Sequence, residues 1–268
     1  MRGIIRPMPV EPIEIAYGEA AGEKLLADVY PQPLPPADGR GAPCALVVHG
    51  GGWASGDKRD DLPFLPALVE AGIVCFSINY RLAPRHPWPA CLDDVHAAIA
   101  WARRSAAAHG GDPKRLALIG YSAGGHLALM DAFTREAPSD VAALVNVAGA
   151  TDMVIDNFRR GGISKALADL IGKTAVDDES LEILWQMSPI NHLRPGTPPV
   201  LIVHGTADKS VPYVSQSIHF QKRIQDLGGS ADLITIEGAP HRISEWTNFG
   251  PDYPKKMAQW LTKTLVAR

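Results

Sequence analysis

The sequence predicts an α/β protein with a mostly parallel central sheet, helices on both faces and a small cap insertion. Short apolar runs alternate with helical patterns along most of the 268 residues. These runs are continuously apolar, which is typical of parallel strands that are covered on both faces. Since a strand, a helix and a parallel strand connect in a right-handed crossover, the alternation places helices on both sides of the sheet.

Each element follows from its own local pattern. Residues 11–30 alternate weakly, as antiparallel strands do, and a loop rich in proline and glycine is expected over 31–43. Runs of apolar and β-branched residues predict buried strands at 44–50, 73–80, 115–120, 142–150, 200–205 and 231–238. Apolar residues at helical spacing, several runs closing on glycine, predict helices at 60–72, 92–111, 123–136, 217–229 and 254–268.

Residues 151–196 interrupt the alternation with two short helical patterns, at 164–172 and 178–187. We interpret this stretch as a small cap above the carboxyl edge of the sheet, not as a second domain. The hydrophobic fraction of 46% is enough to bury one large core in a chain of this length. We therefore expect residues 1–268 to form a single domain.

Composition limits the partners that the chain can attract. The net formal charge is −3, and charged residues make up 21% of the chain. This balance provides no basic surface for nucleic acid or for an anionic membrane. No segment approaches the roughly 20 apolar residues of a membrane span. We expect a small-molecule partner and a protein that is a monomer or a homodimer.

Two further features bear on the compartment and on metals. The N-terminus has no apolar stretch of signal-peptide length, and three prolines interrupt residues 7–12. The expected location is cytoplasmic, although a secreted protein whose signal had been removed would have the same features. Cys44, Cys75 and Cys91 show no metal-ligand spacing and are expected to be buried, inert thiols. We expect no metal and no cofactor.

The strongest local signal for chemistry is Gly120-Tyr121-Ser122-Ala123-Gly124, a G-x-S-x-G motif between a predicted strand and a predicted helix. This is the context in which the motif presents a serine nucleophile on a tight, strained turn. The alternative is a helix-capping serine in a chance pentapeptide. The flanking elements favour Ser122 as the nucleophile.

A second signal is the run from His49 to Trp53, HGGGW, directly after a buried strand. Acyl transfer builds negative charge on the carbonyl oxygen, and preorganised N–H donors stabilise that charge. We assign this oxyanion hole to the N–H groups of Gly51, Gly52 and Ala123. A phosphate-binding loop is disfavoured because no G-K-[ST] follows, and His49 is expected to orient the loop instead of acting as a base.

A serine hydroxyl needs an adjacent imidazole to remove its proton, and nine histidines are available. His241 lies in a loop just past the last predicted strand, where it can reach back to the carboxyl edge of the sheet. Asp208 follows the strand 200–205 and can hold the tautomer of His241. His204 is expected to support the loop that carries this acid, and His126 to pack against the sheet. The order Ser122, Asp208, His241 agrees with the motif.

With these residues in place, the chain resembles the α/β-hydrolase esterases related to hormone-sensitive lipase and the BD-FAE-like enzymes. The likeness rests on HGGGW (49–53), NYRLAPRHPWPACLDD (79–94), GYSAGGHLA (120–128), HGTADKSVP (204–212) and the loop with His241. The resemblance implies a metal-free carboxylesterase that works through an acyl-enzyme. Tyr121 and Ala123 at the variable positions of the nucleophile motif, with little chain before the first strands, favour the smaller BD-FAE-like type.

Five side chains are candidates for the substrate pocket. Trp53, Tyr121, Phe158, Trp185 and Met187 are candidates for lining an acyl or alcohol pocket, or for ordinary packing. The small insertion favours an open site and esters of short acyl chains. Arylformamidase activity and acetyl or feruloyl esterase activity on carbohydrate esters would use the same residues. A hydrolase fold that binds a small ligand without turnover is the alternative of a different class.

Overall fold

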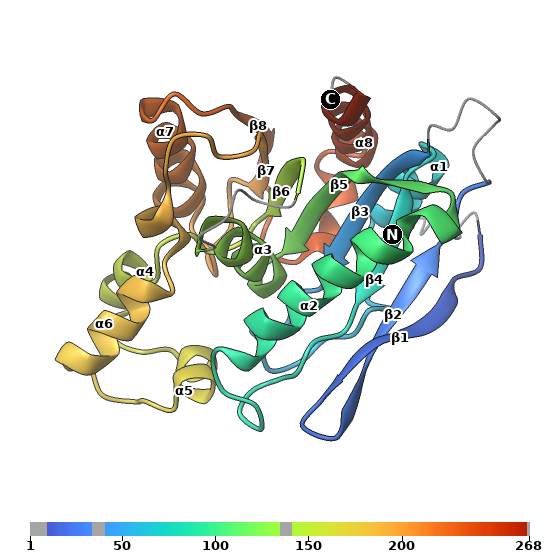
Figure 1. Cartoon of the computed structure of the whole chain (residues 1–268). Helices are drawn as coiled ribbons and strands as arrows, with labels where there is room; N and C mark the ends of the chain where they lie inside the picture. Colours follow the sequence, from blue (N-terminus) through green and yellow to red (C-terminus); the bar gives the residue numbers. More distant parts are fainter. Residues whose placement is uncertain (1–9, 34–40, 135–140, 267–268) are drawn as a thin grey trace.

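The computed structural model describes residues 10–33, 41–134 and 141–266, and its eight strands form one sheet in the order β1-β2-β4-β3-β5-β6-β7-β8 (Figure 1). The strands are β1 (Ile13–Ala20), β2 (Glu23–Tyr30), β3 (Ala42–Val48), β4 (Val74–Ile78), β5 (Gly111–Tyr121), β6 (Ala143–Val147), β7 (Val200–Gly205) and β8 (Ala231–Ile236). Strands β1 and β2 pair antiparallel, β2 is antiparallel to β4, and all remaining pairs are parallel. The predicted mostly parallel sheet is confirmed.

Helices cover both faces of this sheet. They are α1 (Leu65–Glu70), α2 (Ala90–Ser105), α3 (Ala123–Thr134), α4 (Met153–Arg160), α5 (Lys165–Ile171), α6 (Asp178–Gln186), α7 (His219–Asp226) and α8 (Tyr253–Val266). Shorter turns are η1 (Ala106–His109), η2 (Pro189–His192), the π-helical η3 (Val214–Ile218) and η4 (Ile243–Asn248). Buried residues of α2, α3 and α7 belong to one core cluster, and those of α1 and α8 belong to another.

The central strands explain why their sequences are continuously apolar. In β3, Cys44, Leu46 and Val48 contribute to the core under α2 and α3, while Ala45 and Val47 face the core under α1 and α8. Successive side chains of a strand point to opposite faces, so a strand covered on both sides has no solvent-exposed position. All five residues are fully buried.

Several boundaries differ from those that the sequence predicts. The helix expected over 92–111 ends at Ser105, and the tighter turn η1 continues it to His109. Strand β5 begins at Gly111, earlier than expected, because Gly111 pairs with Ala42 before an irregularity in the register. Most of the loop predicted over 31–43, and the last two residues of the helices predicted at 123–136 and 254–268, lie outside the described residues.

The stretch 151–196 holds one helix more than its sequence suggested. The two predicted helical patterns form α5 and α6, and α4 precedes them. The side chain of Asp152 accepts a hydrogen bond from the N–H of Ile155 at the start of α4, and Gly161 ends it at a φ of 72°. A capping aspartate and a closing glycine are ordinary helix boundaries, so this signal was present in the sequence.

An ion pair fixes the turn between β4 and α2. Arg81 donates from Nε and Nη2 to the buried carboxylate of Asp94, at 2.8–3.0 Å, and the Arg81 N–H donates to the same group at 2.8 Å. We expect Asp94→Ala to lower the free energy of unfolding by about 3 kcal/mol, because it leaves the guanidinium without its buried partner. Urea denaturation measures this loss. Asp93→Ala, at the exposed neighbouring position, should leave stability near wild type, and equal effects of the two substitutions would contradict the prediction.

Candidate active site

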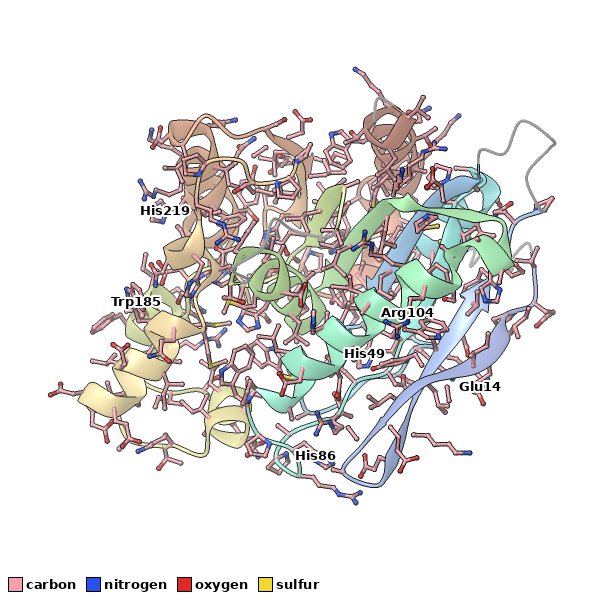
Figure 2. The ribbon with its side chains drawn as sticks, viewed as in Figure 1. Glu14, His49, His86, Arg104, Trp185 and His219 are labelled. Atoms are coloured by element: carbon pink, nitrogen blue, oxygen red, sulfur yellow. The ribbon has the colours of Figure 1, made fainter. Side chains whose placement is uncertain are left out.

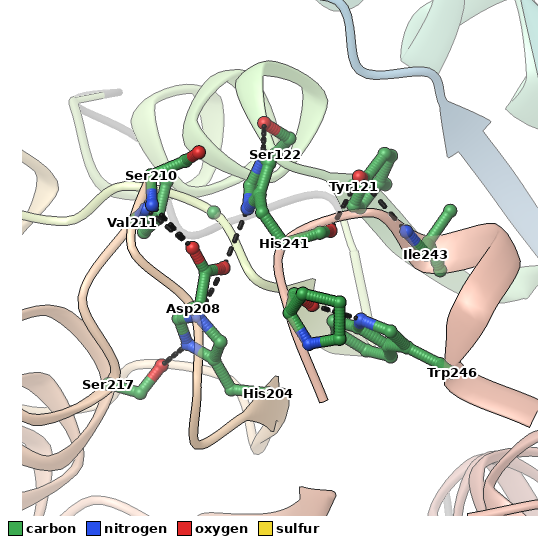
Figure 3. A network of polar contacts seen from close by, with 12 residues as sticks. Tyr121, Ser122, His204, Asp208, Ser210, Val211, Ser217, His241, Ile243 and Trp246 are labelled. Atoms are coloured by element: carbon green, nitrogen blue, oxygen red, sulfur yellow. Dashed lines mark hydrogen bonds and ion pairs between the residues drawn. The ribbon is translucent and has the colours of Figure 1, made fainter. Parts of the chain in front are cut away.

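Three loops bring the predicted catalytic residues to the carboxyl edge of the sheet. Ser122 follows β5, Asp208 lies in the loop after β7, and His241 lies after β8 (Figure 3). These strands are parallel, so their carboxyl ends meet at the same edge, where open α/β sheets bind ligands. Residues that are up to 119 positions apart in sequence therefore come into contact.

A chain of hydrogen bonds joins the three side chains. The Oγ of Ser122 lies 2.9 Å from Nε2 of His241, and Nδ1 of His241 lies 2.6 Å from Oδ2 of Asp208 (Figure 3). A carboxylate accepts from Nδ1–H, which leaves Nε2 free to accept the serine proton. This arrangement can activate a hydroxyl for nucleophilic attack.

The turn that carries Ser122 is sterically strained. Ser122 has a φ of 53°, in the left-handed region that residues other than glycine rarely adopt. A Cβ at position 120 would lie 2.1 Å from the carbonyl oxygen of Gly124, and a Cβ at position 124 would lie 2.2 Å from that of Val48. Both glycines are required by close backbone contact, which lets the strand and the helix meet at the serine.

Several donors stabilise the carboxylate of Asp208. Its Oδ1 accepts the N–H groups of Ser210 and Val211, each at 2.8 Å, and its Oδ2 lies 3.0 Å from Nε2 of His204. Burial opposes ionisation, but the hydrogen bonds from His204 and His241 outweigh it, so the pKa of this carboxyl is held well below its ordinary value. The His204 ring is fixed in turn by Ser217, whose Oγ lies 2.6 Å from Nδ1. His204 thus supports the acid loop, as its sequence position suggested.

Tyr121 holds the backbone of His241. Its hydroxyl donates to the carbonyl of His241 at 2.8 Å, and the two rings stack with centroids 5.6 Å apart (Figure 3). Burial raises the pKa of Tyr121 to about 12, so the hydroxyl stays a donor at neutral pH. The sequence indicated Tyr121 only as a candidate pocket residue, because a contact with a loop 120 positions away leaves no local pattern.

The glycine-rich turn after β3 lies against the residue that precedes the nucleophile, since a Cβ on Gly50 would lie 2.8 Å from the ring of Tyr121. Gly51 has a φ of 110° and Gly52 a φ of 59°, and a Cβ at position 51 would lie 2.1 Å from the carbonyl oxygen of Ser55. Ala123, the third predicted donor, is the first residue of α3 and directly follows Ser122. Next to the turn, the ring of His49 is buried, lies 2.7 Å from the carbonyl of Gly50 and stacks on Tyr80.

The model of the BD-FAE family matches residues 28–224, which include Ser122 and Asp208 and end before His241. The chain belongs to the BD-FAE family.

Relatives of this BD-FAE protein are esterases by name. Esterase LipQ of Mycobacterium tuberculosis is 34% identical over 81% of the chain. The match spans 53% of LipQ, so the chain corresponds to about half the length of this curated relative. Thermogutta terrifontis esterase 2, solved in apo form, shares 27% identity at a TM-score of 0.76, over 98% of this chain and 96% of its own. It has also been solved phosphorylated by paraoxon and with propionate bound.

A second solved neighbour is a truncated form of a carbohydrate esterase from gut microbiota. It shares 25% identity with the chain at a TM-score of 0.75 and covers 96% of this chain and 97% of its own. Both solved structures thus align along nearly the whole chain. The α/β-hydrolase fold expected from the resemblance is confirmed.

The remaining candidate pocket residues of the BD-FAE protein fall into two groups. Trp53 and Met187 are buried in the core, where both contact His126 through hydrogen bonds. Phe158 and Trp185 are exposed and line a groove of about 500 Å³ between α4 and α6. Figure 2 shows Trp185 on α6 at the outer edge of the molecule.

Neither a metal-binding cluster nor a membrane-spanning helix occurs in the part of the chain that the structure describes. Within residues 10–33, 41–134 and 141–266, no group of three or more His, Cys, Asp or Glu side chains could hold a metal ion. In the same ranges, no helix combines the length and the apolar character that crossing a membrane requires.

The three cysteines are free and buried, and burial raises the pKa of each thiol.

Proposed function

We propose that the chain is a serine carboxylesterase that hydrolyses short-chain acyl esters through an acyl-enzyme on Ser122. The observation that carries this proposal is the contact between Ser122 Oγ and His241 Nε2, with Asp208 on the other ring nitrogen. Esterases with this hydrogen-bond order activate serine by general-base catalysis. The names of the relatives support the same reaction class.

The proposed reaction has two steps. Ser122 attacks the ester carbonyl while His241 takes the serine proton, and the N–H groups of Gly51, Gly52 and Ala123 stabilise the oxyanion. His241 then protonates the leaving alcohol and later activates the water that releases the acid. Asp208 orients the imidazole and stabilises the imidazolium in both steps.

The preference for short acyl chains rests on two observations. Thermogutta terrifontis esterase 2 has been solved with propionate, a short acid, bound. In this chain the cap helix α5 lies against the glycine-rich turn of residues 49–53, here called the oxyanion turn, since a Cβ on Gly52 would lie 3.5 Å from the side chain of Ala166. A helix packed this closely against the turn leaves little room there, which favours a small acyl group.

A second candidate keeps the mechanism and changes the substrate. The similarity to the gut carbohydrate esterase supports esters of carbohydrates as the alternative substrate class, with acetyl or feruloyl as the acyl group. Arylformamide hydrolysis would use the same serine and histidine. Binding of a small ligand without turnover is disfavoured by a complete hydrogen-bonded Ser122–His241–Asp208 set.

We propose further that residues 1–268 act as one domain with residues 151–196 as its cap. The eight strands of one sheet and the packing of Leu167, Leu170 and Leu184 into the core under α3 support this division. A cytoplasmic location and a monomeric or homodimeric state complete the proposal.

The test pairs a covalent probe with an ester series. A fluorophosphonate should label the native chain once, and mass spectrometry of the digest should place the adduct on Ser122. Initial rates on p-nitrophenyl esters from acetate to palmitate should peak at a short acyl group, with long chains at least about tenfold slower. Absence of the adduct would reject the serine mechanism. A maximum at long chains would reject the proposed substrate class while leaving the mechanism standing, and formamide and acetylated-sugar substrates separate the alternatives.

A further inference from the structure

His126 is a buried histidine that the proposed reaction does not use. It lies on α3, four residues after Ser122, and its side chain is fully buried. Its Nδ1 lies 3.2 Å from Nε1 of Trp53, and its Nε2 lies 2.7 Å from the carbonyl oxygen of Met187. Both ring nitrogens are therefore engaged by different parts of the chain.

The partners determine the tautomer of His126. An indole N–H can only donate, so Nδ1 must accept from Trp53, and Nε2–H must then donate to the carbonyl of Met187. A charged imidazolium would present a second N–H to the indole and lose that bond. Burial lowers the pKa of His126 to about 4, although the bond to Met187 opposes the shift, so the ring stays neutral near pH 7.

Trp53 belongs to the oxyanion turn. It follows Gly51 and Gly52 directly and has a φ of 60°, a conformation that costs free energy in a residue with a side chain. Such a residue keeps its conformation only where its surroundings hold it. The carbonyl of Trp53 accepts the N–H of Ala83 at 2.9 Å, and the bond to His126 fixes the other end of the residue.

Met187 belongs to the cap. It closes α6, and the ring of His126 contacts its carbonyl at the point where the chain leaves that helix. The ring of Trp88 lies 5.8 Å from that of His126. The backbone N–H of Trp88 donates to the carbonyl of Leu170 in α5 at 2.9 Å. The cap and the oxyanion turn thus both contact His126 on α3.

We propose that His126 is a positioning residue that ties the oxyanion turn to the cap and keeps the Gly51 and Gly52 N–H groups directed at the reacting carbonyl. This inference rests on the proposed esterase function. Helix α3 carries His126 and begins directly after Ser122, so the tie sets the distance between nucleophile and oxyanion donors. A displacement of about 1 Å at such a site can cost a hundredfold in rate.

The sharpest test is Trp53→Phe, which removes the indole donor and keeps an aromatic ring. We expect kcat to fall between about tenfold and a hundredfold, while KM changes less than about twofold, because the donors act mainly in the transition state. The inhibition constant of a trifluoromethyl ketone that forms a tetrahedral oxyanion should rise by the same factor as kcat falls. If the bond between Trp53 and His126 served stability alone, Trp53→Phe would lower the melting temperature without equal changes in kcat and in the inhibition constant.

Two further variants and one control complete the experiment. His126→Gln keeps a donor and an acceptor and should retain more activity than His126→Leu, which keeps neither. Trp101→Phe makes the same ring replacement on α2, where Trp101 packs against Tyr17 and Phe76, and should behave as wild type. Wild-type kcat and inhibition constant in Trp53→Phe, or equal losses in both His126 variants, would overturn the proposal.

Hydrogen–deuterium exchange separates this inference from the proposed function. Amides of residues 49–56 should exchange faster in Trp53→Phe and His126→Leu than in wild type and in Trp101→Phe. Exchange needs no turnover, so this pattern in a chain that cleaves no ester would support the tie and reject the esterase. An active esterase whose variants show unchanged exchange and unchanged kcat would reject the tie alone.

Discussion

Replacing Ser122 with alanine is expected to lower kcat by about a million-fold, the loss typical of a serine nucleophile that acts with a histidine base. The substitution removes only the Oγ that lies 2.9 Å from His241 Nε2. The proposed oxyanion donors Gly51, Gly52 and Ala123 stay in place, so a small residual rate above that of water is expected. Rates on the preferred p-nitrophenyl ester measure the loss, and a melting curve checks that the variant folds.

The double variant Ser122→Ala, His241→Ala makes this prediction sharper. Because the two residues act as one unit, the second substitution should add almost nothing to the loss. Ser244→Ala, at an exposed serine three residues after His241, serves as the matched control and should keep wild-type kcat. Independent losses that multiply would mean that Ser122 and His241 do not share one proton transfer.

The contacts of the candidate triad could be predicted because each residue follows a strand at the same edge. The G-x-S-x-G motif identifies a strand–turn–helix unit by itself, and Asp208 and His241 each follow a recognisable apolar run. Parallel pairing of β5, β6, β7 and β8 then forces the three loops together. Local pattern and sheet topology are therefore sufficient to predict that Ser122, Asp208 and His241 come together, because this prediction needs no detail of side-chain packing.

Contacts that depend on side-chain packing could not be predicted in this way. The bonds from His126 to Trp53 and Met187 join segments that are 73 and 61 positions apart, with no spacing rule between them. The sequence suggested only that His126 packs against the sheet. The sequence indicated Trp53 and Phe158 equally as candidate pocket residues. Trp53 is buried in the core and Phe158 is 68% exposed, because burial depends on tertiary packing.

Strand β5 and helix α4 show two different limits. Gly111 joins β5 through pairing with Ala42, a long-range contact without a local hydrophobic signal. Helix α4 carried both boundary signals, Asp152 and Gly161, but most of its apolar residues form one short run at its start, a pattern that does not distinguish a helix from a strand. Tertiary pairing explains the first difference, and the ambiguity of a short apolar run explains the second.

Asp208→Asn is expected to lower kcat by about ten thousandfold while the fold is retained. The asparagine amide has nearly the shape of the carboxylate, but one of its two ends donates and neither is charged. Oδ2 of Asp208 faces both His204 and His241, so an amide nitrogen there would meet two N–H groups. His241 would then lose the partner that keeps its proton on Nδ1, and Nε2 would no longer accept the serine proton. Asp93→Asn, at an exposed position, should leave kcat unchanged.

The same substitution should change how stability depends on pH. The hydrogen bonds of the folded state hold the pKa of Asp208 below its ordinary value, so the carboxylate contributes stability above the unfolded pKa of about 4. That contribution is lost as pH falls through the folded pKa, where protonation removes the charge. Urea unfolding should therefore show Asp208→Asn less stable than wild type at neutral pH, with a gap that narrows below about pH 4. A gap that stays constant or widens towards low pH would mean that the charge of Asp208 does not stabilise the fold. A loss of kcat without any difference in stability would then assign the carboxylate to orienting His241 alone.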